Sequence, residues 1–440
     1  MRAKRLGGFA LLIELTLGCG RTTHSAGSSG SSGDVAVPPG GGSAFGGEGP
    51  AGGEAVVGGE PAVGEEPTFG GGTSLPHLGP AGGTPLGSGT PEPDMLPAGT
   101  CGVLRAIQPP SDVEARQAVV TRQAGGFAIG PWKSGALGDV IDGLFIDSTG
   151  RKHTDFTAHG TSSDVAWSVL MADRRLVVDV YVAPGAASPL DAFNTRFWAN
   201  GNHAPTERGT LLAASWRGTD YVLTQPSLDG KSAVFALWPT GIAEPQAAVI
   251  GTDGARVGMP QSLGPPDHQF GKCQVVVPTL DGGIVSYFDP DNVALRLSRL
   301  GADGARSLDL AWPLLGEPHA CPLFALRDAG FGFLVDDAAE GESPQFRINY
   351  VAADGSGLEA PIAFASSPLA WTTTSAGLLF LEQGPAGYSL ELKPEAGPPR
   401  IFPLPSLSAQ LRPVLGEAGS IYVDSGGSDE PRTLLELTCR

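Results

Sequence analysis

His153, Asp155 and His159 are the first residues in the chain whose types and spacing could do chemistry, as ligands of a metal ion. Imidazole nitrogens and carboxylate oxygens are common zinc ligands. However, the two histidines lack the helical i, i+4 spacing of many zinc sites and have no third ligand nearby. The surrounding segment is rich in Gly, Thr and Ser, which is typical of loops. We therefore interpret both histidines as solvated loop residues and predict no metal site there.

The acidic segment 289–292 (Asp-Pro-Asp-Asn) begins like an oxygen-rich calcium loop. A calcium loop of the alternating type continues with further oxygen ligands, a glycine and a closing acidic residue. Three apolar residues, 293–295, follow here instead, so the set of ligands would be incomplete. A turn between the second and third strands of a repeated unit explains the same residues, and we predict no cofactor.

No constellation typical of catalysis stands out elsewhere. No Gly-x-Ser-x-Gly segment lies between a strand and a helix to expose a nucleophilic serine. Paired carboxylates could hydrolyse glycosides, but sequence alone does not place two of them about 5–9 Å apart. The tryptophans are spread along the chain, which favours packing over a sugar-stacking platform: Trp132, Trp167, Trp198, Trp216, Trp238, Trp312 and Trp371. We therefore assign no catalytic residue.

The N-terminus has the composition of an export signal. Three basic residues among positions 2–5 precede an apolar run over 6–17. A short apolar run behind positive charges is typical of a secretory signal and not of a membrane span.

The end of this run, residues 15–19 (Leu-Thr-Leu-Gly-Cys), resembles the lipobox of bacterial lipoproteins. The resemblance implies cleavage before Cys19 and attachment of lipid to it. Two positions depart from the pattern, because Thr16 replaces a small or apolar residue and Glu14 interrupts the apolar core. Ordinary secretion without lipid is the main alternative, and a cytosolic protein is a further one.

Residues 20–97 have the composition of a disordered tether. They are dominated by Gly, Ser, Pro and Ala and contain only two aromatic residues, Phe45 and Phe69. Such a segment cannot bury enough apolar surface to offset its chain entropy. We therefore divide the chain into a signal peptide (1–19), a disordered tether (20–97) and one globular domain (98–440).

An internal repeat organises the globular domain. Small or glycine-containing turns recur at 124–126, 281–283, 329–330, 376–377 and 418–419, with weaker candidates at 174–175 and 217–218. A second glycine follows most of them: Gly150, Gly201, Gly254, Gly304, Gly355 and Gly397. Glycine suits hairpin turns that need a positive φ. The spacing predicts seven units, the third of them stretched by an insertion between Leu228 and Gly254.

The strands before the second glycine alternate apolar and polar residues. Phe346, Ile348 and Tyr350 alternate with Arg347 and Asn349, as in an antiparallel strand with one buried face. Seven such units predict an all-β fold, a β-propeller of seven four-stranded blades after the disordered Gly/Ser/Pro-rich segment. The domain resembles the broad β-propeller class in architecture alone, because it lacks Trp-Asp, kelch and Asp-box signatures. A pair of β-sandwiches is the alternative.

Five cysteines fit an exported protein. If Cys19 carries lipid, four remain, and an oxidising compartment allows two disulfides. Cys439 takes the place of a third-strand residue in the last unit, so the segment beginning at Cys101 could supply the missing outer strand and form a disulfide with it. Cys273 and Cys321 lie at similar points in the first strands of adjacent units, which predicts a second disulfide between them.

The formal charge of −18 and a pI near 4.7 disfavour binding to nucleic acid or to anionic lipid. We expect a monomer in the cell envelope, either lipid-anchored at the outer membrane or secreted, that contacts the membrane only through the anchor. The leading hypothesis is a non-enzymatic propeller whose loops bind an extracellular or periplasmic protein or glycan. The alternative is an enzyme that acts on extracellular polysaccharide with carboxylates at the propeller channel.

Overall fold

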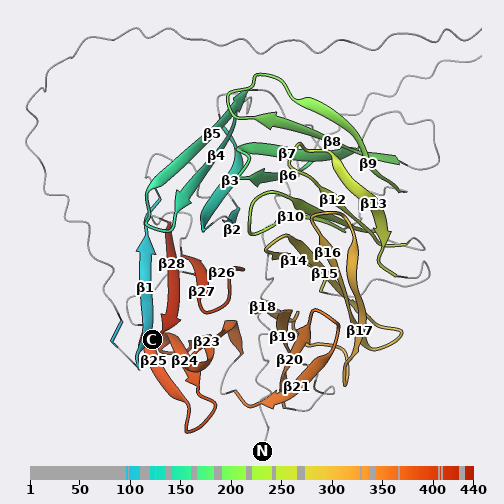
Figure 1. Cartoon of the computed structure of the whole chain (residues 1–440). Helices are drawn as coiled ribbons and strands as arrows, with labels where there is room; N and C mark the ends of the chain where they lie inside the picture. Colours follow the sequence, from blue (N-terminus) through green and yellow to red (C-terminus); the bar gives the residue numbers. More distant parts are fainter. Residues whose placement is uncertain are drawn as a thin grey trace, which may run out of the picture. The chain divides into compact units, whose positions relative to one another are not determined.

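The computed structural model describes residues 96–97, 99–109, 119–123, 125–134, 140–159, 166–182, 191–214, 221–239, 244–264, 273–327, 330–336, 338, 343–364, 367–404, 407, 410–425 and 432–440. The predicted signal peptide with Cys19, and all but the end of the predicted tether, lie outside these ranges. Within them the regular elements are β-strands (Figure 1), and no helix there is long and apolar enough to cross a membrane.

The strands form seven four-stranded antiparallel sheets, the blades of a propeller. Blade 1 consists of β2 (Val120–Gln123), β3 (Gly126–Ser134), β4 (Val140–Asp147) and β5 (Lys152–His159), and blade 2 of β6 (Ala166–Met171), β7 (Leu176–Val182), β8 (Asp191–Ala199) and β9 (Thr206–Ala214). Blade 3 consists of β10 (Tyr221–Pro226), β11 (Ala233–Trp238), β12 (Gln246–Ile250) and β13 (Arg256–Ser262), and blade 4 of β14 (Val275–Thr279), β15 (Gly282–Asp289), β16 (Ala294–Gly301) and β17 (Arg306–Pro313).

The remaining blades complete the ring. Blade 5 is β18 (Leu323–Arg327), β19 (Gly330–Asp336), β20 (Phe346–Ala352) and β21 (Gly357–Ile362); blade 6 is β22 (Pro368–Thr374), β23 (Gly377–Gly384), β24 (Gly387–Lys393) and β25 (Arg400–Leu404); blade 7 is β26 (Leu411–Val414), β27 (Ile421–Ser425), β28 (Thr433–Cys439) and β1 (Cys101–Ile107). The seven-bladed propeller predicted from the repeat is confirmed.

The ring is closed by its N-terminal strand. β1 pairs with β28 as the outer strand of blade 7, with Cys101 opposite Cys439. The two cysteines form a disulfide, and a second disulfide joins Cys273 to Cys321, as predicted. One detail of the prediction is wrong: Cys273 and Cys321 each lie two residues before the first strand of their blade, not within it.

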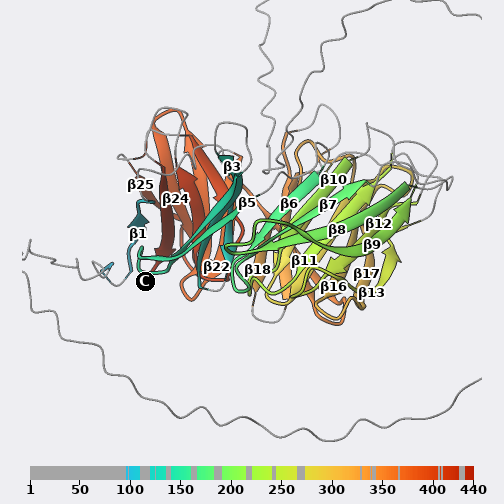
Figure 2. The ribbon, with the colours of Figure 1, turned by 90° about the horizontal axis from the view of Figure 1, so that it is seen from above.

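The two ends of the ring differ in their connections (Figure 2). We call turn face the end where turns join first to second and third to outer strands. We call loop face the end where second strands lead to third strands and each blade leads to the next. All six glycines predicted for the third-to-outer turns lie in those turns with φ between +76° and +104°. The local turn chemistry was therefore predicted correctly.

The third blade corrects the sequence analysis. Its first-to-second turn lies between β10 and β11, not at 217–218, which precede β10 and lie outside the described residues. Gly230 takes a φ of +69° there, and the Asp229 carboxylate accepts hydrogen bonds from the Ser227 hydroxyl and the Lys231 amide. With the turn in this place the blades are evenly spaced, and no insertion stretches the third one.

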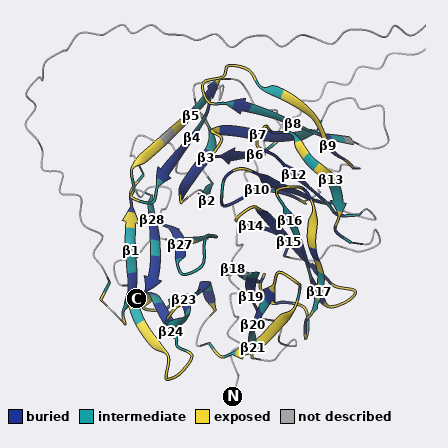
Figure 3. Ribbon diagram, in the orientation of Figure 1, coloured by how far each residue is buried: buried dark blue, intermediate teal, exposed yellow. Residues whose placement is uncertain are grey.

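The hydrophobic core is divided among the interfaces between blades. Among the described residues seven clusters of buried side chains exist, one for each pair of neighbouring blades. The fully buried strand β11 shows why: Phe235 packs towards blade 2, whereas Val234 and Trp238 pack towards blade 4. Successive side chains of a strand point to opposite faces, so each second strand contributes to two clusters. Figure 3 shows dark inner strands and paler outer ones.

Six tryptophans lie in or against six different clusters, which confirms the packing interpretation for them; Trp216 lies outside the described residues. They are Trp132, Trp167, Trp198, Trp238, Trp312 and Trp371. Of the described residues, five are buried between blades 5 and 6, and six partly buried ones pack against them; the five are Ala325, Leu334, Ile348, Trp371 and Phe380.

Candidate functional site

The inner strands that line the ring axis carry no acidic residue. None of the residues in β2, β6, β10, β14, β18, β22 and β26 is Asp or Glu, whereas three are arginine: Arg122, Arg327 and Arg412. Two of these arginines lie beside carboxylates, because Arg122 forms an ion pair with Glu417 and Arg412 lies opposite Asp424 in the strand register. The carboxylates that the enzyme alternative expected at the channel do not come from these strands, but the turns that join first to second strands carry several: Asp173, Asp229, Asp281 and Glu417.

Buried carboxylates instead close the second-to-third connections of the blades. Asp336 accepts a hydrogen bond from the Gln345 amide across its loop at 2.9 Å, and Asp424 contacts the Arg432 guanidinium at 3.0 Å. Burial raises the pKa of Asp424, despite the opposing effect of the nearby arginines. Each carboxylate thus joins the two ends of a connection, which is a structural role.

The segment that resembled a calcium loop is a turn between β15 and β16, the second and third strands of blade 4, as the sequence analysis preferred. The oxygens of buried Asp289 accept hydrogen bonds from the Asn292 amide and side chain and from Arg296 Nε. Burial raises the pKa of Asp289, but these hydrogen bonds outweigh it, so that the pKa lies below its usual value. The oxygens of the Asp289 carboxylate are therefore used by hydrogen-bond donors of the protein itself.

The histidines considered as ligands lie on strand β5, not in a loop, which corrects the sequence analysis. Both are exposed, as expected. The ring of His159 stacks on that of His203 at 4.5 Å between centroids, joining blades 1 and 2. Within the described residues no group of three or more His, Cys, Asp or Glu side chains could hold a metal ion.

A pocket of about 810 Å³ opens on the turn face, where blade 5 meets blade 6. Blade 5 contributes most of its lining, blade 6 contributes a run of hydroxyl side chains, and the β26–β27 turn of blade 7 closes one side: Arg327, Gly330, Tyr350, Val351, Ala352, Ser356, Gly357, Leu358, Thr373, Thr374, Ser375, Ala418 and Gly419. Its volume falls in the range of about 300–1,000 Å³ typical of small-molecule sites.

Arg327 and Tyr350 form the charged end of this pocket. The Arg327 guanidinium lies 4.3 Å from the centroid of the Tyr350 ring, a cation–π arrangement. Burial raises the pKa of Tyr350, and the neighbouring guanidinium only partly opposes this effect. The phenol is therefore protonated at neutral pH, and Arg327 supplies the positive charge.

A chain of aromatic rings holds Tyr350 in place through the interface of blades 5 and 6. Tyr350 packs edge-on against Trp371, Trp371 against Phe380, and Phe380 against Phe364, at centroid distances of 6.2, 6.4 and 4.6 Å. The indole Nε1 of Trp371 donates to the Leu323 carbonyl at 2.7 Å, which ties the chain to β18. The ring under Arg327 is thus fixed by packing rather than left mobile.

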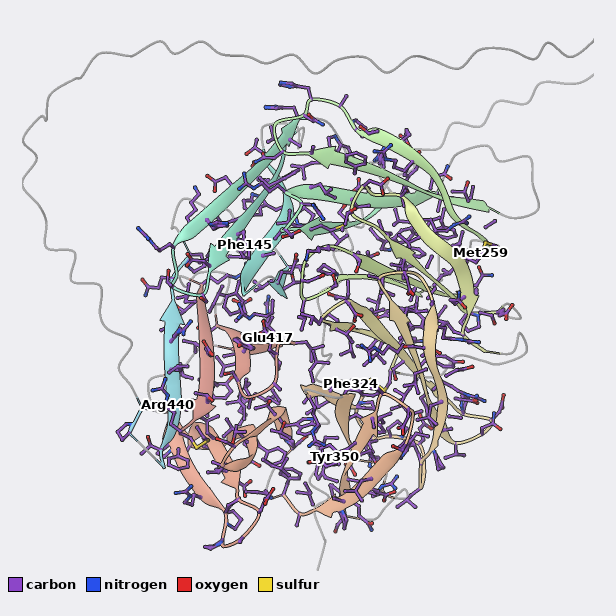
Figure 4. All side chains as sticks on the ribbon, in the orientation of Figure 1. Phe145, Met259, Phe324, Tyr350, Glu417 and Arg440 are labelled. Carbon is purple, nitrogen blue, oxygen red and sulfur yellow. A yellow bond between two sulfur atoms is a disulfide. The ribbon has the colours of Figure 1, made fainter. Side chains whose placement is uncertain are left out.

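The β26–β27 turn separates the pocket from blade 1. Gly419 donates its amide to Thr372 Oγ1 in blade 6, whereas Glu417 forms a 2.8 Å ion pair with Arg122 in blade 1. Figure 4 places Glu417 near the middle of the ring and Tyr350 on blade 5. The carboxylate beside the pocket is therefore already paired with an arginine.

The sequence analysis missed this pocket. Two local signals were present: an arginine at the end of an inner strand, Arg327, and the hydroxyl run 372–375 directly before the turn at 376–377. Neither is specific by itself, because arginines and threonines are common at strand ends. Their meeting depends on the packing of two blades.

Comparisons with known proteins assign the chain to no family. No protein-family model matches the chain, and no curated protein does. Among solved structures it is similar to an oligogalacturonate lyase in complex with manganese (10% identity, 78% of this chain and 98% of the other, TM-score 0.42). Two others are polysaccharide lyase Uly1 (9%, 73% and 89%, 0.41) and the AfRom2 CNH domain (8%, 72% and 94%, 0.35). At these values the matches say nothing about ligand or reaction.

Proposed function

We propose that this protein is a binding propeller, which holds a protein or glycan ligand in the pocket between blades 5 and 6 without chemical change. One observation carries the proposal: the described residues of the pocket lining combine one guanidinium, one tyrosine, four hydroxyl side chains and several glycines, and none of these described residues carries a carboxylate, an imidazole or a thiol. Ligand sites typically combine an apolar wall with a few polar groups that fix orientation.

The same lining argues against acid–base chemistry in this pocket. General acids and bases work best with pKa values near the operating pH. The raised pKa of Tyr350 moves it further from that range. Its ring is also covered by Arg327, so it serves as a platform.

We also propose that Cys19 carries a lipid and displays the propeller from the cell envelope. The two disulfides of the domain support export, because such bonds persist in oxidising compartments. Mass spectrometry of the exported protein tests the anchor: a diacylated N-terminal cysteine is expected, and a mature chain that begins elsewhere without lipid would overturn it.

Filling the pocket tests the binding function. Ala352 lies at the turn-face end of β20, is exposed and lines the pocket. Ala352→Trp should therefore occupy the space without disturbing the core. Ala213→Trp, on an exposed position of the outer strand β9, is the matched control. The purified protein is screened against glycan arrays and secreted proteins, with binding and turnover recorded together.

We expect ligands that bind the wild-type protein and the Ala213 variant but lose affinity for the Ala352 variant, with no product formed. Turnover abolished by Ala352→Trp would make the protein an enzyme. An affinity that is unchanged in the Ala352→Trp variant would place the ligand elsewhere on the propeller.

A further inference from the structure

Arg327 is exposed at the turn-face end of β18, where it lines the pocket over the Tyr350 ring. Arg122, Arg196, Arg296, Arg347 and Arg432 each form an ion pair with a carboxylate at 2.6–3.4 Å. Arg412 lies opposite Asp424 in the strand register, and its charge opposes the rise in the pKa of that carboxyl caused by burial. Arg327 forms no ion pair with any described carboxylate and has only the Tyr350 ring beneath it. Among the described residues, no carboxylate neutralises its charge.

The geometry of a stacked guanidinium selects the kind of group that it can bind. Stacking uses the flat face of the guanidinium and leaves its N–H groups directed outwards in the plane. Such a planar fork matches the two oxygens of a carboxylate, with two parallel hydrogen bonds. The Tyr350 ring beneath the guanidinium packs against Trp371, which stacks on Phe380, so the interface of blades 5 and 6 sets the position of this platform. Preorganised groups lose less entropy on binding.

The opposite wall of the pocket offers hydroxyl groups. Thr374 and Thr372 use their hydroxyls within the protein, in bonds with Gly377, Ala376 and Gly419. The hydroxyls of Thr373 and Ser375 make no hydrogen bond with the described residues, and both line the pocket. Two unused hydroxyls beside a cation suit a ligand that is itself rich in hydroxyl groups.

We propose that the ligand of this pocket is an acidic oligosaccharide, whose carboxylate is bound by Arg327 and whose hydroxyls bond to Thr373 and Ser375. The inference rests on the proposed binding function and names its ligand class. Two described carboxylates beside the pocket are engaged within the protein: Glu417 pairs with Arg122, and the Asp354 Oδ1 accepts hydrogen bonds from Ser356 within its own turn.

Matched pairs of probes test the assignment. Calorimetry on the wild-type protein compares uronic-acid oligosaccharides with their carboxyl-reduced neutral counterparts of equal length. Arg327→Gln removes the charge and the fork, whereas Arg327→Lys keeps the charge alone. Arg208→Gln is the control, because Arg208 also stacks on an aromatic ring, Phe197 at 4.8 Å, but lies on the outer strand of blade 2.

The acidic member of a pair should bind more tightly than the neutral one, and added salt should reduce this difference. Arg327→Gln should weaken binding of the acidic member by about tenfold to a hundredfold, the effect of losing a hydrogen-bonded charge contact. The affinity of the Arg327→Lys variant should lie between those of the wild-type protein and Arg327→Gln, and the affinity of the Arg208→Gln control should equal that of the wild type. Equal thermal unfolding of all variants shows that they are folded, as exposed Arg327 predicts.

The outcomes separate the two proposals. Two results would overturn the acidic assignment but keep the binding function. In the first, neutral oligosaccharides bind as tightly as acidic ones. In the second, Arg327→Gln leaves binding unchanged whereas Ala352→Trp abolishes it. An acidic peptide that occupies the pocket where no saccharide does would overturn the saccharide class. Turnover of the probes would overturn the binding function itself.

Discussion

Asp289 shows how a single carboxylate holds a blade together. It is almost fully buried and receives hydrogen bonds from the turn 290–293 and from Arg296 of the next strand. Because these bonds favour the charged form, the pKa of Asp289 in the folded protein lies below its usual value. A group with a depressed folded pKa stabilises the fold above its unfolded pKa and loses that contribution as the pH falls through the folded value.

Asp289→Asn should lower the free energy of unfolding by about 1.5–3 kcal/mol at pH 7, because a charge-assisted contact is lost. Urea unfolding at a series of pH values measures it. The difference in the free energy of unfolding between wild type and variant should have its full size above about pH 5 and should shrink below the pKa of Asp289 in the unfolded chain. Asp281→Asn, which affects an exposed ion pair, should change stability much less. A gap that does not change with pH would contradict the assignment of the stabilisation to the ionised carboxylate.

Strands β19, β20 and β22 together make the platform of the pocket. Gly332 of β19 leaves room for two rings, because a Cβ there would lie 2.5 Å from the nearest atom of Trp371 and 3.2 Å from Tyr350. The position of Tyr350 under Arg327 thus depends on a glycine one strand away. This dependence links the packing between blades 5 and 6 to the site.

Gly332→Ala should therefore destabilise the propeller by about 1–3 kcal/mol, as overpacking does. It should also weaken ligand binding although it touches no ligand, because Trp371 and Tyr350 must move. Thermal unfolding and calorimetry measure the two effects. Gly384→Ala, in the neighbouring blade, is the control, since the nearest atom to its added Cβ is 3.9 Å away. Unchanged stability in the Gly332 variant would show that the rings move freely.

Closure of the ring depends on both termini of the domain. The Cys101–Cys439 disulfide spans 338 residues, whereas Cys273–Cys321 spans 48. A cross-link stabilises mainly by restricting the unfolded chain, and more so for longer loops. The first disulfide also joins the paired strands β1 and β28, whose hydrogen bonds hold blade 7 together.

The double variant Cys101→Ser with Cys439→Ser should lose more stability than Cys273→Ser with Cys321→Ser. The chain-entropy relation gives upper values of about 6 and about 4 kcal/mol, respectively. Urea unfolding of the exported proteins compares them, with the reduced wild type as reference. A larger loss in the second variant would show that the loop face between blades 4 and 5 limits stability instead.

Local features of the sequence determined the architecture of this protein. Turn glycines such as Gly355 and the alternation around Tyr350 act over a few residues, so that they revealed the blades without knowledge of any neighbour. Once the repeat was aligned, equivalent positions in different blades predicted both disulfides. The third blade was misaligned because Arg217 and Gly218 resembled a turn, while the true signal was Asp229 with Gly230.

Tertiary structure alone decided where a ligand could bind. Period-two alternation assigns Tyr350 to one face of a strand, but it does not tell which neighbouring blade that face meets or how well the interface is filled. Arg327, Tyr350 and Thr373 come from three strands of two blades, and they share a pocket where those two blades meet. Packing between elements distant in sequence is a property of the assembled ring, whereas φ preferences and hydrophobic periods are properties of the chain.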